Sequence, residues 1–299
     1  MRRVLTALLL GASLLAGCAA TSTPGGAQGG RIPVVAGESP WGAIAAAVGG
    51  RHVAVTSLLW APGADPHEFQ PTAAAAAAVA RARVVVMNGL GYDPFMDRML
   101  AQGSVGPQRV VVAARVLGVA GPDANPHLWY DLARVPMVAR AIARSLAAVD
   151  PSHQDAYRTG LATFLAALAP DRSALAALAA RHGGAPVLVT ERVANDLLAE
   201  AHLRIVSPAS FARAIESGQS PSAAATAGID ALLRPARARA LILNSQVATP
   251  ATDAVRRQAR AAGVPVVLMT ETVQPPRSTF VRWQARQIAA LSSALGRSA

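Results

Sequence analysis

Four residues of metal-ligand type follow four of the short β-branched segments of this sequence. They are His67 (in DPHEF), His127 (in NPHLW), Glu191 and Glu271, with each glutamate following a threonine. Ligands of open parallel sheets bind beyond the carboxyl ends of the strands, so we expect the four side chains to share one cleft. Imidazole suits zinc and iron and carboxylate suits manganese, and neither group oxidises outside the cell as a thiol does. The pattern therefore predicts a site for one divalent transition metal.

A preceding proline distinguishes His67 and His127 from the other histidines. Proline fixes its own φ and restricts its neighbour, so each of these two imidazoles is presented from a stiff turn. The remaining histidines, which we expect to be surface or hydrogen-bonded groups, are His52, His153, His182 and His202. Taken alone, Glu191 could also cap a helix, and Glu271 could be a surface charge in a loop.

The sequence lacks the signatures of common enzymes. His67-Glu68 begins like HExxH, but Pro71 occupies the place of the second histidine. There is no G-x-S-x-G motif and no P-loop. A metal closed in by four protein ligands also leaves little room for the activated water of a catalytic zinc site. We therefore expect a binding protein and not an enzyme.

Two other kinds of binding protein stay open on the sequence alone. A receptor for an organic ligand needs aromatic stacking residues, and the chain has only 12 aromatic residues. Trp129 and Tyr130 are the best candidates, although we expect them to pack in the core. A surface adhesin-type lipoprotein is the second alternative.

The elements that would position these residues alternate between strands and helices. The expected strands are Ile32–Ala36, Val53–Leu58, Val84–Asn88, Val110–Ala113, Val187–Thr190, Arg204–Ser207, Ala240–Asn244 and Val264–Met269. Alanine-rich segments of helical length, such as Thr72–Ala82, Ser222–Leu233 and Pro250–Ala262, lie between them. This alternation predicts an α/β fold of two lobes, each a four-stranded, mainly parallel sheet with helices on both faces.

A long helical stretch separates the two groups of strands. Its first part, Arg134–Val149, ends at Asp150-Pro151, and a second helix then continues to Arg181. Pro170 lies inside this second helix, and we expect it to kink or split the helix. The last helix is expected at Ser278–Leu295, with Phe280, Trp283, Ile288 and Leu291 buried.

The first residues have the pattern of an export signal. Arg2 and Arg3 precede a largely apolar run of 13 residues, Val4–Ala16, which is too short for a bilayer core of roughly 30 Å. The run ends in Leu-Ala-Gly-Cys18, which resembles the bacterial lipobox, in which the cysteine becomes the lipidated first residue. Cys18 is the only cysteine, and Gly-rich residues 19–31 have no apolar period. We expect residues 1–17 to be a signal peptide and 18–31 a flexible tether.

Composition adds little about partners. The formal charge is +11, all 28 basic residues are arginine, 52% of the chain is hydrophobic and 15% is charged. This composition excludes a disordered chain. Because we expect an address outside the cytoplasm, we read the charge as a dispersed solvated surface and expect no nucleic-acid partner.

The motifs together resemble one family, the metal-binding solute receptors of ABC importers of the zinc/manganese class. The resemblance rests on residues 59–100, which contain the DPH turn and NGLGYD, on NPHLWYDL at 125–132, and on AGVPVVLMTETVQPP at 262–276. It implies His67 and His127 as ligands from the first lobe and Glu191 and Glu271 from the second. Many zinc receptors have a third histidine at the position of Glu191 and a long His/Asp-rich loop, whereas residues 118–125 are short and contain no histidine. The ligand set resembles the manganese type more closely, and zinc, manganese or iron stays open as the cargo.

The resemblance also implies the organisation and the partners of the protein. An N-terminal lobe at 32–150, a connecting helix at 151–182 and a C-terminal lobe at 183–299 would close slightly on one Zn²⁺ or Mn²⁺ ion. The receptor would deliver the ion to an ABC transporter permease. It would act as a monomer outside the cytoplasm, anchored to the cell membrane through lipidated Cys18.

Overall fold

Eight strands form two separate parallel sheets. The computed structural model describes residues 30–62, 69–234 and 237–297. The first sheet contains β1 (Ile32–Glu38), β2 (Val53–Leu59), β3 (Val84–Met87) and β4 (Arg109–Val112), and the second contains β5 (Pro186–Val189), β6 (Arg204–Ile205), β7 (Ala240–Asn244) and β8 (Val266–Met269). The strand orders are β2-β1-β3-β4 and β6-β5-β7-β8, and all pairs are parallel. The predicted α/β fold with two four-stranded sheets is confirmed, and the two sheets have the same order.

The central strands are hydrophobic because helices cover both of their faces. Every residue of β3 and of β7 is buried, as expected for a parallel sheet between helical layers. β6 is shorter than the predicted strand because a side chain replaces main-chain pairing at its end. The Ser207 hydroxyl accepts from the Val189 N–H at 2.7 Å and donates to the Val189 carbonyl at 2.9 Å.

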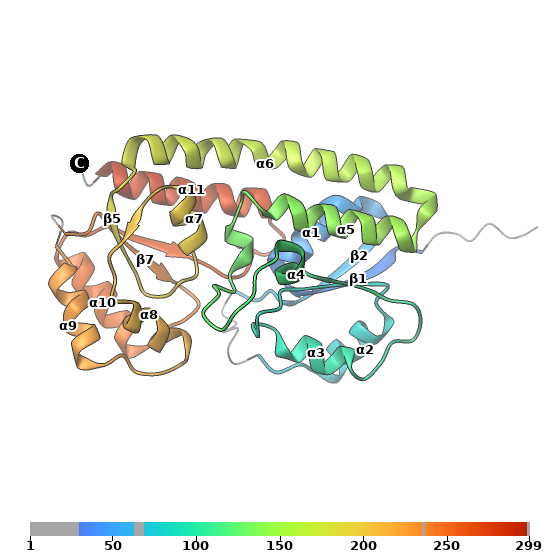
Figure 1. Ribbon diagram of the computed structural model, residues 1–299, viewed down its shortest axis with the longest axis horizontal. Helices are drawn as coiled ribbons and strands as arrows, with labels where there is room; N and C mark the ends of the chain where they lie inside the picture. The colour runs from blue at the N-terminus through green and yellow to red at the C-terminus, as the bar shows by residue number, and fades with distance from the viewer. Residues whose placement is uncertain (1–29, 63–68, 235–236, 298–299) are drawn as a thin grey trace, which may run out of the picture. The chain divides into compact units, whose positions relative to one another are not determined.

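Helices connect the strands in both halves (Figure 1). The first half contains α1 (Ser39–Gly49), α2 (Ala73–Arg81), α3 (Pro94–Leu100), α4 (Ala113–Leu117) and α5 (Val135–Val149), with 3₁₀ turns at Gly50–His52, Leu128–Tyr130 and Pro151–His153. The second half contains α7 (Asn195–Glu200), α8 (Ala209–Glu216), α9 (Ala223–Leu232) and α10 (Pro250–Ala261). The predicted alanine-rich helices begin where Thr72, Ser222 and Thr249 accept a backbone N–H of the first turn.

One long helix, α6 (Gln154–His182), runs past both sheets (Figure 1). It continues through Pro170, so the expectation that this proline splits the helix is wrong. Pro170 has no N–H to offer the carbonyl of Ala166, four residues earlier. Both residues are exposed, so water can satisfy that carbonyl while packing on the opposite face keeps the helix intact.

A continuous hydrophobic core links the two sheets through α6 and α11 (Phe280–Arg297). It includes residues of β1 and β3, Phe164 of α6 and Val187 of β5. The predicted stripe of α11 is buried, with Phe280 6.0 Å from Phe164 between ring centroids. From Arg31 onward, the described residues accordingly form one compact unit. The lobe boundaries at 32–150, 151–182 and 183–299 stay a prediction.

One described segment, Pro151–His182, is long and apolar enough by length and composition to cross a membrane. Tyr157, Phe164 and Leu168 of this segment are buried in the shared core, and α6 contacts α1, α5 and α11. We interpret its apolar character as core packing, with alanines on the exposed face.

The exposed position of Pro170 predicts a stabilising substitution. Pro170→Ala restores one helical hydrogen bond and removes the ring, so we expect it to raise the free energy of unfolding by about 1–3 kcal/mol. Pro136→Ala is the matched control, because Pro136 lies in the first turn of α5, where the missing N–H has no partner anyway. Urea unfolding checks both variants. If Pro170→Ala is no more stable than Pro136→Ala, Pro170 does not destabilise α6.

Candidate metal centre

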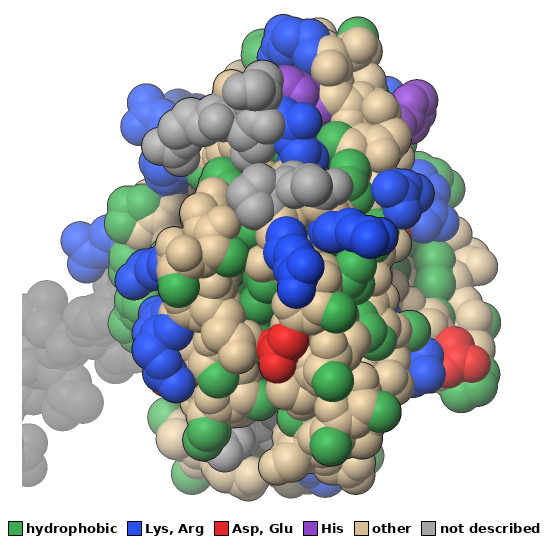
Figure 2. Space-filling view, turned by 90° about the vertical axis from the view of Figure 1, so that its left-hand side faces the viewer, with side chains coloured by type: hydrophobic (Ala, Val, Ile, Leu, Met, Phe, Trp, Pro, Cys, Tyr) green, Lys and Arg blue, Asp and Glu red, His purple; other side chains and the backbone are tan. Residues whose placement is uncertain are grey.

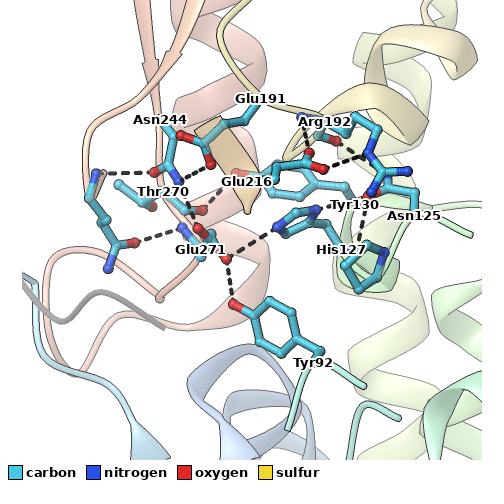
Figure 3. Close-up of polar contacts among 12 residues, drawn as sticks. Tyr92, Asn125, His127, Tyr130, Glu191, Arg192, Glu216, Asn244, Thr270 and Glu271 are labelled. Carbon is cyan, nitrogen blue, oxygen red and sulfur yellow. Dashed lines mark hydrogen bonds and ion pairs between the residues drawn. The ribbon is translucent and has the colours of Figure 1, made fainter. Parts of the chain in front are cut away.

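Three of the four predicted site residues, His127, Glu191 and Glu271, lie close together beyond the carboxyl ends of the strands (Figure 3). Glu191 follows β5 by two residues and Glu271 follows β8 by two residues. His127 precedes the 3₁₀ turn Leu128–Tyr130 in the first half. His127, Glu191 and Glu271 are each 1% exposed. His67 lies in residues 63–68, outside the described residues, as does Cys18.

The His127 ring is oriented by a neighbour in its own turn. Its Nδ1 lies 2.8 Å from Oδ1 of Asn125, and its Nε2 lies 3.2 Å from Oε2 of Glu271. An amide oxygen only accepts hydrogen bonds, so Nδ1 carries the proton and Nε2 presents its lone pair in the neutral ring. A lone pair that faces a buried carboxylate oxygen requires a proton or a cation between them.

Asn244, the last residue of β7, connects the two carboxylates. Its amide Nδ2 donates to Oε2 of Glu191 at 3.1 Å and to Oε1 of Glu271 at 2.6 Å. Its Oδ1 accepts the N–H of Gln246 at 3.0 Å, which fixes the direction of the amide. Gln246 in turn accepts the N–H of Glu271 at 2.6 Å. The two acids are therefore placed by amides from β7 and the loop after it.

Tyr92 supplies a further contact to Glu271 from the first half. Its hydroxyl donates to Oε2, the same oxygen that faces His127. Burial raises the pKa of Tyr92 well above its usual value, and the charge of Glu271 adds to this effect. The phenol therefore stays neutral and remains a donor. One carboxylate oxygen thus meets both a tyrosine hydroxyl and an imidazole nitrogen.

Polar contacts hold the two halves together beside the site (Figure 3). Nη1 of Arg192, the residue after Glu191, donates to the carbonyl of Asp123 at 2.9 Å. Asn125 Nδ2 donates to the carbonyl of Arg192 at 3.2 Å and to Asp196 Oδ2 at 3.3 Å. Asn125 therefore both orients His127 and connects its turn to the second half.

A second buried acidic pair, Glu38 and Asp93, lies in the first half. Asp93 accepts the N–H groups of Asn88 at 2.6 Å and Gly89 at 2.8 Å. Glu38, the last residue of β1, is 1% exposed. Burial raises the pKa of Glu38 well above its usual range, and Asp93 raises it further. Glu38 therefore holds its proton to higher pH than an exposed glutamate.

Sequence reasoning missed the residues that orient the predicted ligands. Asn244 and Glu38 have no motif of their own, although both end buried strands. Tyr92 belongs to NGLGYD, but that motif suggested no contact with a ligand. Among the described residues, no group of three or more His, Cys, Asp or Glu side chains is placed to hold a metal. Of the histidines expected to be bystanders, His52 stacks on His153 with ring centroids 4.0 Å apart, beside Asp150. The expected packing of Trp129 and Tyr130 is confirmed, because both rings are fully buried.

Two parallel sheets, each covered by helices, with buried polar side chains between them are typical of one class of protein, the two-lobed solute-binding proteins. Within this class, the model of the family described as zinc-uptake complex component A, periplasmic, matches residues 34–294. The chain belongs to this family, which confirms the resemblance drawn from the motifs.

Individual proteins agree with this assignment. The manganese-binding lipoprotein MntA of Bacillus subtilis is 29% identical over 165 residues, which cover 53% of each chain. The manganese ABC transporter substrate-binding lipoprotein PsaA of Streptococcus pneumoniae is 25% identical over 178 residues, 55% of this chain and 57% of PsaA. The chain thus spans little more than half the length of these relatives. The structure of FpvC from Pseudomonas aeruginosa in complex with Mn²⁺ matches with a TM-score of 0.74 at 20% identity, over 90% of this chain and 100% of FpvC, and shows the same fold.

The raised pKa of Glu38 predicts a change in the pH dependence of stability. The folded protein keeps the Glu38 proton at pH values where the unfolded chain has lost it. The contribution of Glu38 to the free energy of unfolding is therefore fully present below pH 4.5, the ordinary pKa of a glutamate, and is lost as the pH rises towards the pKa of the folded state. Glu38→Gln removes this loss. We expect the free energy of unfolding of Glu38→Gln, relative to the unsubstituted protein, to increase from about pH 4.5 to pH 7.

Urea unfolding at several pH values measures the difference. Asp97→Asn, at an exposed carboxylate of α3, is the control and should leave the shape of the profile unchanged. Parallel profiles for Glu38→Gln and the unsubstituted protein would show that Glu38 has the same pKa in both states.

Proposed function

We propose that this protein is an extracytoplasmic solute-binding lipoprotein that captures one divalent transition metal and delivers it to an ABC importer. The observation that carries the proposal is the contact of His127 with Glu271. Nε2 of a buried imidazole lies 3.2 Å from a buried carboxylate oxygen, and a divalent cation bound to both atoms would satisfy both groups. Family membership and the names of the relatives support the same function.

The proposed ligands are His67, His127, Glu191 and Glu271. The described residues contain one imidazole and two carboxylates of this set, on three different segments. In the described structure these three are not themselves placed as a metal-holding group, and His67 would add the fourth ligand. Two carboxylates neutralise the charge of a divalent cation, which reduces the free energy needed to remove the ion from water. Asn244 and Tyr92 would hold the carboxylates in place, as the outer hydrogen-bond partners of metal ligands commonly do.

The chemistry of these ligands fits a transition metal. A set of nitrogen and oxygen donors with no thiolate suits Zn²⁺ or Mn²⁺, and Zn²⁺ binds more tightly than Mn²⁺ at most such sites. Binding strength in vitro therefore does not identify the cargo. Metal content of the protein from its native host, grown with each metal limited in turn, distinguishes the two cargoes.

The surroundings of the site favour a small ion over an organic ligand. The aromatic side chains that would stack on such a ligand, Trp129 and Tyr130, are fully buried. The Tyr130 hydroxyl oxygen lies 2.7 Å from both the Thr270 carbonyl oxygen and Gln287 Oε1, donates to one of them, and is committed to the core. We infer a binding function without a chemical reaction, since four protein ligands would leave the ion no position for an activated water.

Location and assembly complete the proposal. We propose that residues 1–17 direct export, that lipidated Cys18 anchors the protein outside the cytoplasmic membrane, and that residues 18–31 act as a tether. The partner would be the permease of the importer, and the receptor itself would be a monomer. The two sheets would move little relative to each other on binding, because a single core joins them through α6 and α11.

The ligand assignment predicts a loss of affinity on removal of one imidazole. His127→Ala should weaken binding of Zn²⁺ and Mn²⁺ by more than about tenfold, because loss of a mere outer hydrogen-bond partner already has an effect of about that size. Calorimetry of chelator-stripped protein measures this, with His182→Ala, at the partly exposed last residue of α6, as the control. Thermal unfolding shows whether the variants are folded. If the unsubstituted protein binds neither metal, or His127→Ala binds both as tightly, the proposed site is wrong.

The anchor predicts a change of location. Cys18→Ala should release the protein from membranes, because the chain offers no other cysteine for acylation, and two acyl chains on one cysteine give stable anchoring. Fractionation of cells that express each form measures the result, with Ser13→Ala as a control inside the signal. A Cys18→Ala protein that still sediments with membranes would contradict the anchor.

A further inference from the structure

A groove with an arginine rim lies beside β4, the edge strand of the first sheet, and no part of the proposed metal site contributes to it. It has a volume of about 410 Å³. Its lining, here called the β4 groove, consists of Arg109–Val112, Arg115, Val116, Ala141, Arg144, Ser145 and Ala148. The floor is therefore made of valine and alanine side chains.

The main chain of β4 is open towards this groove. The strand order places β4 at the edge of its sheet, with β3 on one side only. The Arg109 N–H bonds to Arg83 on the β3 side, so the N–H and C=O of Val110 point away from β3 by the alternation of a strand. The Val110 side chain is 45% exposed. An apolar, unpaired edge of this kind pairs readily with another extended chain.

The arginines of the rim have no acidic partners in the described part of the chain. Arg109, Arg115 and Arg144 belong to none of the ion pairs of the described residues. Arg109 begins β4, and Arg115 lies in α4 just beyond its end. Their backbone positions are therefore on the order of 10–20 Å apart, at about 3.3 Å per strand residue. This spacing fits an extended anion better than a compact one.

We propose that the β4 groove binds an extended acidic segment of a partner protein, which adds as a strand to β4. The main chain of the segment would pair with the open edge at Val110. Alternate side chains would lie on the valine and alanine floor or meet the three arginines, the usual division between affinity and specificity in strand addition.

Charge excludes two other occupants. A second copy of this chain bound through the same face would bring arginines against arginines, which is unfavourable. Residues 1–31 contain no aspartate or glutamate, so this segment of the chain itself offers nothing to the rim. On the face shown in Figure 2, arginine side chains are spread out among apolar, neutral and a few acidic side chains.

A synthetic peptide can take the place of the partner segment in a direct test. The probe is a capped hexapeptide of alternating glutamate and valine, and binding is measured by calorimetry at low salt. Two control peptides have lysine for glutamate, or methyl groups on alternate main-chain nitrogens. We expect the acidic peptide to bind with a dissociation constant below about 1 mM, near the weak limit of specific recognition, and both control peptides to bind at least about tenfold more weakly.

Protein variants locate the binding surface. Arg109→Gln and Arg144→Gln should each weaken peptide binding by about tenfold, the usual effect of losing one charge-assisted hydrogen bond. Arg257→Gln, at an exposed arginine of α10, should leave it unchanged. All three positions are on the surface, so the variants should fold, and unchanged thermal unfolding verifies this.

Three results would overturn the proposal. Equal binding of the methylated acidic peptide would mean that charge alone attracts it and that no strand is added. Equal weakening by Arg257→Gln would mean that the whole basic surface is responsible. Absence of peptide binding, together with Arg144-dependent binding to vesicles of anionic lipid, would assign the groove to a membrane surface instead.

Discussion

Burial of two carboxylates beside an imidazole lone pair is the constraint on which the rest of this structure depends. Glu191, Glu271 and His127 are each 1% exposed, and buried charges of one sign repel each other strongly where water cannot screen them. Asn244 reduces this repulsion by donating to both acids. A divalent cation bound between the two carboxylates would offset this repulsion further.

The frame around the site explains how such a site can be maintained. Two sheets of the same order present their carboxyl ends to each other, and α6 and α11 join them through one core. The side chains that orient the ligands come from different elements: Asn244 from β7, Asn125 from the turn before His127, and Tyr92 from the loop before α3. Hydrogen bonds from these elements, which are packed against a common core, hold the proposed ligands His127, Glu191 and Glu271 in place.

The sequence predicted the parts of this arrangement that have a period or a motif. The eight strands follow from β-branched runs, and the presentation of His127 follows from the proline before it. The expectation for Pro170 fails, because propensity describes an isolated helix and not one whose opposite face is buried at Phe164 and Leu168. Asn244, Tyr92 and Glu38 could not be recognised, since an amide, a phenol or an acid at a strand end acquires its role only from the residue that it meets. In each case that residue is far away in the sequence.

The central claim is that histidine and carboxylate side chains directly coordinate the bound ion. X-ray absorption spectroscopy of the zinc-loaded protein tests this claim most directly. The account predicts a first shell of nitrogen and oxygen only, with zinc–nitrogen distances of about 2.0–2.1 Å and the outer scattering of two imidazoles, falling to one imidazole in His127→Ala. A first shell without imidazole scattering, or a spectrum that His127→Ala leaves unchanged, would contradict it.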